Sequence, residues 1–274
     1  MRTLINGLSG DSILAADRGL AYGDGVFETV RVVNGRPILL ELHLARLNRG
    51  CKRLGLDLDS QCLQDEVQAL CTGSNPSDQI LKIIVTRGIG GRGYRSDNIQ
   101  QANRYISINA YVFDAQMSQT GCALHLCETT LARQPLLAGI KHLNRLEQVL
   151  AAAELPADYQ EGLMRDTRGH MIEGIRSNLF IVTAGALITP DLSNSGVCGV
   201  MRELICQLLP VQIKALDLGA VLAAEEVFVC NSVFGIYPVT RIDAAGQPLA
   251  TFPVGRVTQA CQDQVTEFTG VNLR

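Results

Sequence analysis

The sequence predicts an α+β protein built from two domains. Its 274 residues allow one large domain or two medium ones, and 47% hydrophobic residues are enough to fill the core. Segments that repeat every two residues, as strands do, are mixed with segments that repeat every 3.6 residues, as helices do. The two kinds do not alternate regularly, so a small α+β domain joined to a strand-rich one is favoured over a doubly wound parallel sheet.

The first 114 residues are expected to form the N-terminal domain. Strands are expected at 27–33, 37–40, 81–86 and 105–113, and helices at 40–54 and 63–70. The strand segments alternate apolar and polar residues, and Asn34-Gly35 is a typical hairpin turn between the first two. The first helix has leucine or cysteine at spacings of four, three, four and three residues, which places an apolar stripe along one side.

The polar stretch 115–121 is the expected linker, and residues 122–274 form the expected second domain. Strands are expected within 179–189 and 227–239, and helices at 143–153, 201–209 and 257–268. Two of these helices show apolar stripes at helical spacing. The stripes contain Leu146, Val149 and Leu150 in one helix and Val257, Cys261, Val265 and Phe268 in the other.

Charge and hydropathy argue against two classes of partner. The net charge is −3 and the 24 basic residues are scattered, so there is no basic patch for nucleic acid or an anionic membrane. No run approaches the roughly 18 to 20 apolar residues of a membrane span, and the first residues lack an apolar signal core. We therefore expect a cytoplasmic protein that binds neither nucleic acid nor membranes.

The nine cysteines predict neither a metal site nor a disulfide framework. They include no C-x2-C pair and no histidine at ligand spacing. An odd number in a long, slightly acidic chain also argues against a secreted, disulfide-bonded protein. Most are expected to be buried thiols, with Cys51, Cys62 and Cys261 on apolar helix faces.

Lysine is scarce, with four lysines against 20 arginines, so a lysine-dependent reaction has few candidates. Three of the lysines fit ordinary helix or strand positions: Lys52, Lys82 and Lys214. Lys141 differs because it follows the apolar run 135–140 and precedes a helix. Apolar surroundings lower the pKa of a lysine, as a nucleophilic or Schiff-base lysine requires. The alternative is a surface lysine whose stem covers apolar residues.

The segment 139–148 (GIKHLNRLEQ) resembles the lysine segment of the fold-type IV pyridoxal-phosphate enzymes. A second signature of this family follows at 173–180 (EGIRSNLF), with Leu187 to Pro190 (LITP) after it. The resemblance runs from Ile5 to Val239, nearly the whole chain. It implies a small α/β sandwich N-terminal domain, a larger β-barrel-like C-terminal domain, pyridoxal 5′-phosphate as cofactor, and a homodimer.

The resemblance also implies roles for individual residues. Lys141 would form the covalent link to the cofactor and move protons. Glu173 would pair with the pyridine nitrogen, steadied by Asn178. The phosphate would be held by Arg46, by the backbone N–H groups of Val200 and Met201 at the start of a helix, and by Ser232. Met201 stands where many relatives have threonine, so only its backbone can serve there.

Within this family the sequence leans toward the 4-amino-4-deoxychorismate lyases. The segment 87–94 (RGIGGRGY) and the full 141–147 string look close to that branch, whereas 27–31 (FETVR) departs from the F-E-G-I-R of branched-chain aminotransferases. Arg87, Arg92 and Tyr94 would bind the two carboxylates of a chorismate-type substrate. Without the resemblance, the same segment reads as a flexible basic loop.

The implied reaction is a β-elimination that gives 4-aminobenzoate, a folate precursor, and pyruvate. The small-molecule substrate would be 4-amino-4-deoxychorismate, and Thr29 or Tyr111 is a candidate proton donor to the departing enolpyruvate. Two alternatives stay open at this point. One is an aminotransferase for D-amino acids or branched-chain amino acids on the same scaffold, and the other is a binding protein that keeps the fold without catalysis.

Overall fold

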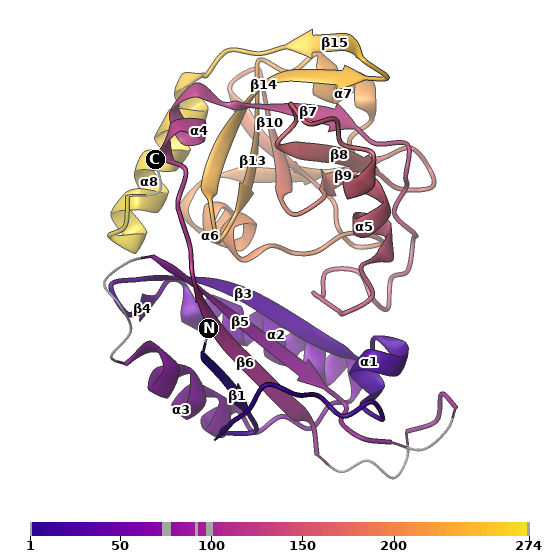
Figure 1. Cartoon of the computed structure of the whole chain (residues 1–274). Helices are drawn as coiled ribbons and strands as arrows, with labels where there is room; N and C mark the ends of the chain where they lie inside the picture. The colour runs from indigo at the N-terminus through magenta and orange to yellow at the C-terminus, as the bar shows by residue number, and fades with distance from the viewer. Residues whose placement is uncertain (1, 73–77, 91–92, 97–100, 273–274) are drawn as a thin grey trace. The chain divides into compact units, whose positions relative to one another are not determined.

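The computed structural model describes residues 2–72, 78–90, 93–96 and 101–272, and it confirms the predicted α+β class (Figure 1). Its contacts divide the chain into two compact units. Unit 1 comprises Met1–Phe113 and Ile140–Asn144, and unit 2 comprises Asp114–Gly139 and Arg145–Arg274. The sequence boundary at 114 therefore lies close to the division of the structure, but the short segment that carries Lys141 joins unit 1 rather than unit 2.

The described part of unit 1 is built on an antiparallel sheet of six strands, ordered β2-β1-β6-β5-β3-β4. Its elements are β1 (Arg2–Ile5), β2 (Leu8–Ser9), α1 (Arg18–Tyr22), β3 (Gly25–Val33), β4 (Arg36–Pro37), α2 (Leu40–Leu54), α3 (Ser60–Cys71), β5 (Gln79–Thr86) and β6 (Asn103–Ala110). The hairpin between β3 and β4 turns at Asn34 and Gly35, both with positive φ, as the sequence predicts.

Helices α2 and α3 pack on one face of this sheet. The apolar stripe of α2, with Leu44 and Leu47, meets Val26 and Val30 of β3 in one buried cluster. Because strand side chains alternate between faces, Phe27 and Thr29, which alternate with these valines, point to the opposite face. Two lysine amines lie near the Phe27 ring on this second face, as described below.

Unit 2 is a strongly curved sheet that closes on itself. In the described residues nine strands are ordered β12-β11-β10-β13-β14-β7-β8-β9, β15 pairs with β14, and β9 pairs again with β10 through Glu173 and Asn178. The elements are α4 (Ala115–Thr120), β7 (Cys122–Leu126), α5 (Leu146–Ala153), β8 (Glu161–Arg165), β9 (Met171–Gly174), β10 (Asn178–Thr183), β11 (Ala186–Pro190), α6 (Val200–Leu208), β12 (Val211–Lys214), α7 (Leu218–Leu222), β13 (Glu226–Asn231), β14 (Gly235–Ala244), β15 (Gln247–Thr251) and α8 (Arg256–Thr269). The return pairing gives the β-barrel-like domain that the resemblance implies.

Three details differ from the sequence expectations. Most of the expected linker 115–121 is helix α4, capped by Asp114, whose side chain accepts a hydrogen bond from the N–H of Gln116. Met117 of this helix packs against the core of unit 2, which a polar composition does not reveal. Cys62 is exposed, because it lies beside the apolar stripe of α3 rather than on it.

The apolar stripe expected in α5 is not buried within the chain. Leu146, Val149 and Leu150 are 76%, 60% and 60% exposed, whereas Gln148 and Ala151 face the interior. In α8, Phe268 is likewise exposed, although Cys261 and Val265 are buried as predicted. Periodicity identified an apolar side of α5, and the structure shows that this side is not the one covered by unit 2.

No helix within the described residues is both long enough and apolar enough to cross a membrane.

Candidate active site

Lys141 is held at the edge of β3 in unit 1. The backbone N–H of Phe27 donates to the carbonyl of Lys141 (2.9 Å), and the N–H of Leu143 donates to the carbonyl of Gly25 (3.0 Å). The segment 140–144 therefore runs beside the first half of β3, on the edge that β5 does not occupy. This pairing fixes the backbone of the one lysine that the sequence singles out.

A second lysine lies near the same aromatic ring. The Lys141 amine is 4.5 Å from the centre of the Phe27 ring, and the Lys82 amine is 3.8 Å from it. In the register of β3 and β5, Lys82 lies opposite Thr29. Burial lowers the pKa of Lys82 to about 8, although the negative charge of Glu28 acts in the opposite direction. The alternation of strand residues does not predict this, because it does not show which face of the sheet lacks a helical cover.

Arg46 lies in a fully buried ionic cluster on α2. Its Nε donates to Glu28 Oε1 (2.8 Å) and its Nη2 donates to Glu28 Oε2, while His43 Nδ1 lies 2.6 Å from the same carboxylate. Burial alone would raise the pKa of Glu28, but Arg46 and His43 outweigh it and hold the pKa at about 2. Burial lowers the pKa of His43, so its ring is neutral and donates from Nδ1. Arg46 is thus oriented by Glu28, and any phosphate would use other N–H groups of its guanidinium.

In unit 2, Glu173 and Asn178 form a buried polar pair where β9 meets β10. The N–H of Val197 donates to Glu173 Oε2 (2.8 Å), and the Asn178 amide lies 3.4 Å from the same oxygen. The Asn178 amide also donates to the carbonyl of Val197 (2.8 Å). Asn178 and the loop residue Val197 therefore both contact the Glu173 carboxylate.

The start of α6 has the form of an anion site. Gly199 is the residue before the helix and offers no side-chain cap, so the first N–H groups, those of Val200 and Met201, lack a partner within the helix. A Cβ on Gly199 would lie 1.9 Å from Asn178 Oδ1, so only glycine fits this close approach. Ser232 lies in the turn after β13. Both places suit a phosphate group.

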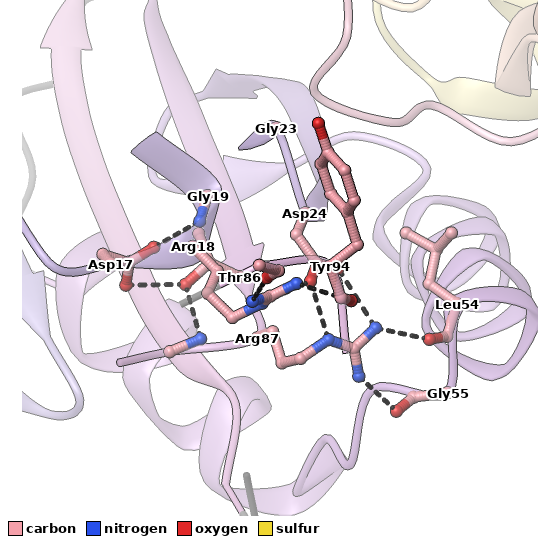
Figure 2. A network of polar contacts seen from close by, with 12 residues as sticks. Asp17, Arg18, Gly19, Gly23, Asp24, Leu54, Gly55, Thr86, Arg87 and Tyr94 are labelled. Carbon is pink, nitrogen blue, oxygen red and sulfur yellow. Dashed lines mark hydrogen bonds and ion pairs between the residues drawn. The ribbon is translucent and has the colours of Figure 1, made fainter. Parts of the chain in front are cut away.

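Arg87 of the expected substrate loop is engaged inside unit 1 (Figure 2). Its Nε and Nη2 donate to the Asp24 carboxylate at 2.8 and 3.0 Å, and its guanidinium also donates to the carbonyls of Leu54 and Gly55. The structure thus gives Arg87 a structural role. These contacts use four of the five N–H groups of its guanidinium.

The two other loop residues differ from Arg87. Arg92 lies outside the described residues. Tyr94 is 87% exposed, and its ring meets the ring of Tyr22 edge-on at 5.6 Å between centres. Its carbonyl accepts a hydrogen bond from Arg18 (Figure 2). An exposed aromatic side chain on an anchored backbone suits contact with a ligand.

The described residues contain no group of three or more His, Cys, Asp or Glu that could hold a metal ion. Cys198 follows Val197, whose N–H donates to Glu173, and Cys230 is the second-last residue of β13, two positions before Ser232. Cys230 is fully buried, and burial raises the pKa of its thiol. A protonated, enclosed thiol is a poor nucleophile.

The α/β sandwich of unit 1 and the closed sheet of unit 2 define a fold-type IV enzyme. The chain belongs to the amino-transferase class IV family, whose pattern matches residues 25–242. It is 34% identical to an aminodeoxychorismate lyase of Vibrio harveyi, covering 94% of this chain and 97% of that protein.

Two further relatives show that the family contains both lyases and aminotransferases. The crystal structure of 4-amino-4-deoxychorismate lyase from Pseudomonas aeruginosa matches with a TM-score of 0.90 and 44% identity, covering 97% of this chain and 98% of that one. A putative branched-chain-amino-acid aminotransferase of Methanocaldococcus jannaschii is 30% identical, covering 92% of this chain and 89% of that protein. Lyases and aminotransferases therefore share this scaffold, and the identity to the lyases of Vibrio harveyi and Pseudomonas aeruginosa is higher than the identity to this aminotransferase.

Proposed function

We propose that this protein is a pyridoxal-phosphate-dependent lyase that converts 4-amino-4-deoxychorismate to 4-aminobenzoate and pyruvate. The observation that carries the proposal is Lys141, fixed on β3 with its amine beside Phe27, in a chain 44% identical to a lyase of this kind. A second amine, that of Lys82, lies near the same ring and supplies a positive charge for a substrate with carboxylates.

The residues present fit pyridoxal phosphate. The uncapped start of α6, with Val200 and Met201, and the hydroxyl of Ser232 suit its phosphate, as does Arg46. The buried Glu173 carboxylate suits the protonated pyridine nitrogen. When bound, the cofactor supplies a ring that accepts the electron pair of a broken C–H bond.

Lys141 has the central part in the reaction we propose. Its amine takes the proton from the amine-bearing carbon of the substrate. The enolpyruvyl group then leaves with the electrons of its C–O bond, and with a proton it becomes pyruvate. The substrate ring becomes aromatic, so the protein's main task is to orient the breaking bonds. Thr29, in register with Lys82, is the candidate donor of the proton to the leaving group.

Product analysis tests this function directly. Protein reconstituted with pyridoxal phosphate is given 4-amino-4-deoxychorismate alone, and separately D-alanine or leucine with 2-oxoglutarate. We expect 4-aminobenzoate and pyruvate to appear in equal amounts without any keto acid. Turnover only in the presence of 2-oxoglutarate would make the protein an aminotransferase, and no turnover with a bound cofactor would indicate a binding protein.

We also propose that the enzyme is a homodimer in the cytoplasm. The exposed apolar residues Leu146, Val149 and Leu150 on one side of α5 suit contact with a second copy. The nine cysteines are free thiols in the structure, which suits a reducing compartment. Light scattering should give twice the chain mass for the wild type and a smaller mass for Leu150→Glu. A monomeric wild type would contradict this assembly.

A further inference from the structure

Arg18, the first residue of α1, is a buried arginine that the proposed reaction does not use. It is 3% exposed, although arginine is seldom buried without partners. Its Nε donates to Asp24 Oδ2 (3.0 Å), its Nη1 to the carbonyl of Gly93 (2.8 Å) and its Nη2 to the carbonyl of Tyr94 (3.1 Å). Figure 2 shows Arg18 between Asp24 and Tyr94. One side chain thus connects the core of unit 1 to two consecutive carbonyls of the loop.

Asp24 holds this arginine in place. Its carboxylate accepts hydrogen bonds from both Arg18 and Arg87, and although burial acts to raise its pKa, these two guanidinium groups lower it on balance. Asp24 is therefore ionised at neutral pH. Arg87 in turn donates to the carbonyls of Leu54 and Gly55 at the C-terminal end of α2, so hydrogen bonds connect α2 to the loop without a break.

Arg18 contacts the loop at two places, at Gly88 and at Gly93 with Tyr94. The backbone N–H of Arg18 donates to the carbonyl of Gly88 (2.9 Å), and its guanidinium holds Gly93 and Tyr94. Both glycines have positive φ, which lets the backbone turn toward the arginine. The Tyr94 ring is nevertheless exposed, and it contacts the ring of Tyr22. The Arg18 guanidinium carbon lies 4.7 Å from the centre of the Tyr22 ring.

We infer that Arg18 is a positioning residue that fixes the backbone at Gly93 and Tyr94 and so presents the Tyr94 ring to the substrate. The inference rests on the proposed function for the identity of that substrate. Holding two carbonyls and a carboxylate at once needs the planar fork of a guanidinium, which a lysine ammonium cannot reproduce. A side chain on a fixed backbone also loses less freedom when it binds a ligand.

The test compares Arg18→Met and Arg18→Lys with a matched control, Arg104→Met. Arg104 forms a similarly buried ion pair in unit 1, and its guanidinium donates to Glu66 of α3 rather than to the described residues of the loop. We expect Arg18→Met to raise KM for 4-amino-4-deoxychorismate about tenfold, with kcat and the absorbance of the bound cofactor close to wild type. Arg18→Lys should fall between, and Arg104→Met should leave KM unchanged.

A double-mutant cycle with Tyr94→Ala shows whether Arg18 acts through Tyr94. If it does, the loss in the double variant should be well below the product of the two single losses. Independent, multiplying effects would overturn the inference, as would an unchanged KM in both Arg18 variants. If Arg18→Met does not fold, Arg18→Lys with the same cycle decides the question.

Proteolysis gives a readout that does not depend on the reaction. Trypsin cleavage after Arg95, which is exposed, should be faster in Arg18→Met than in Arg104→Met at equal global stability. Equal cleavage rates would mean that Arg18 does not hold the loop. If the wild type forms no 4-aminobenzoate, the proposed function fails while this measurement still tests the anchor; if the wild type is active, KM and the cycle test the presentation of Tyr94.

Discussion

The carbonyl of Lys141 accepts a hydrogen bond from the N–H of Phe27, and the ring of Phe27 lies 4.5 Å from the amine of Lys141. The same residue therefore holds both the backbone and the side chain of the candidate catalytic lysine. This pairing places residues 140–144 in unit 1, although the residues before and after them in sequence belong to unit 2. The position of Lys141 is therefore determined by the pairing of its backbone with β3.

Lys141→Ala should abolish turnover and the near-ultraviolet or visible absorbance of bound cofactor. The band arises from the covalent link that only this amine can form in our proposal. In the wild type, borohydride should bleach the band. Lys52→Ala on the exposed side of α2 is the matched control and should keep both band and activity. Retention of the band in Lys141→Ala would show that another lysine carries the cofactor.

Lys82→Met should raise KM for 4-amino-4-deoxychorismate about tenfold, as the loss of one charge-assisted contact of about 1.4 kcal/mol would do. The pKa of Lys82 is lowered to about 8, so its positive charge is present below that pH and lost above it. In the wild type, KM should accordingly rise as the pH passes about 8, and in Lys82→Met this rise should be absent. Lys214→Met on the exposed strand β12 should behave as wild type. A pH profile identical in Lys82→Met and wild type would exclude the role.

Glu28→Gln should destabilise the protein by about 3–5 kcal/mol at pH 7, because it leaves the Arg46 guanidinium buried without its counter-charge. The pKa of Glu28 is lowered to about 2, so its stabilising charge is fully present above the unfolded pKa near 4.5 and is lost as the pH falls through 2. Urea unfolding should show the gap between wild type and variant shrinking over that range. Glu41→Gln, exposed at the start of α2, should have little effect. An equally small effect of Glu28→Gln would mean that the cluster does not stabilise the fold.

Gly199→Ala should weaken binding of pyridoxal phosphate. The added Cβ would lie 1.9 Å from Asn178 Oδ1, so Asn178 must shift away from Glu173 and from the carbonyl of Val197. Losing such a buried hydrogen bond costs about 1–3 kcal/mol, which corresponds to a dissociation constant roughly 5- to 150-fold higher. Titration of the apoenzyme measures it, and Gly219→Ala, at an open helical position, is the control. Unchanged affinity would show that this close approach does not matter for the cofactor.

Cys198→Ser and Cys230→Ser should retain turnover within about threefold, because neither sulfur takes part in the proposed chemistry. Cys230 lies fully buried, and burial raises the pKa of its thiol, so the reactive thiolate is not formed near neutral pH. Steady-state kinetics with the cofactor band as a loading control would measure this. A variant that loses activity while the cofactor stays bound would contradict it.

The sequence predicted well where one local pattern is decisive. The α2 stripe, with Leu44 and Leu47, has no competing strand pattern, and the helix begins and ends at residues 40 and 54 as expected. The turn at Asn34 and Gly35 needs positive φ at both positions, which these two residue types tolerate best.

The features that the sequence did not predict depend on which other element covers a given face of a strand or helix. No local sequence pattern contains that information. Lys82 alternates like any strand residue, and only the register with β3 shows that it lies near Phe27. The α5 stripe was visible, but its exposure was not. The binding of a substrate carboxylate by Arg87 stays a prediction. The partners of Arg87 in the structure, Asp24 and two carbonyls, lie 30 or more positions away in sequence, so no local pattern shows them.

The closed sheet of unit 2 returns from β9 to β10 through a single residue pair, Glu173 with Asn178. The side chains of these two residues are also the proposed contacts of the pyridine ring, so the proposed cofactor site lies where the barrel closes. Cofactor bound there would bridge the seam and add its binding free energy to the stability of the native barrel. Loading of the enzyme and completion of the barrel would then be coupled events, with the apoenzyme opening first along β9 and β10.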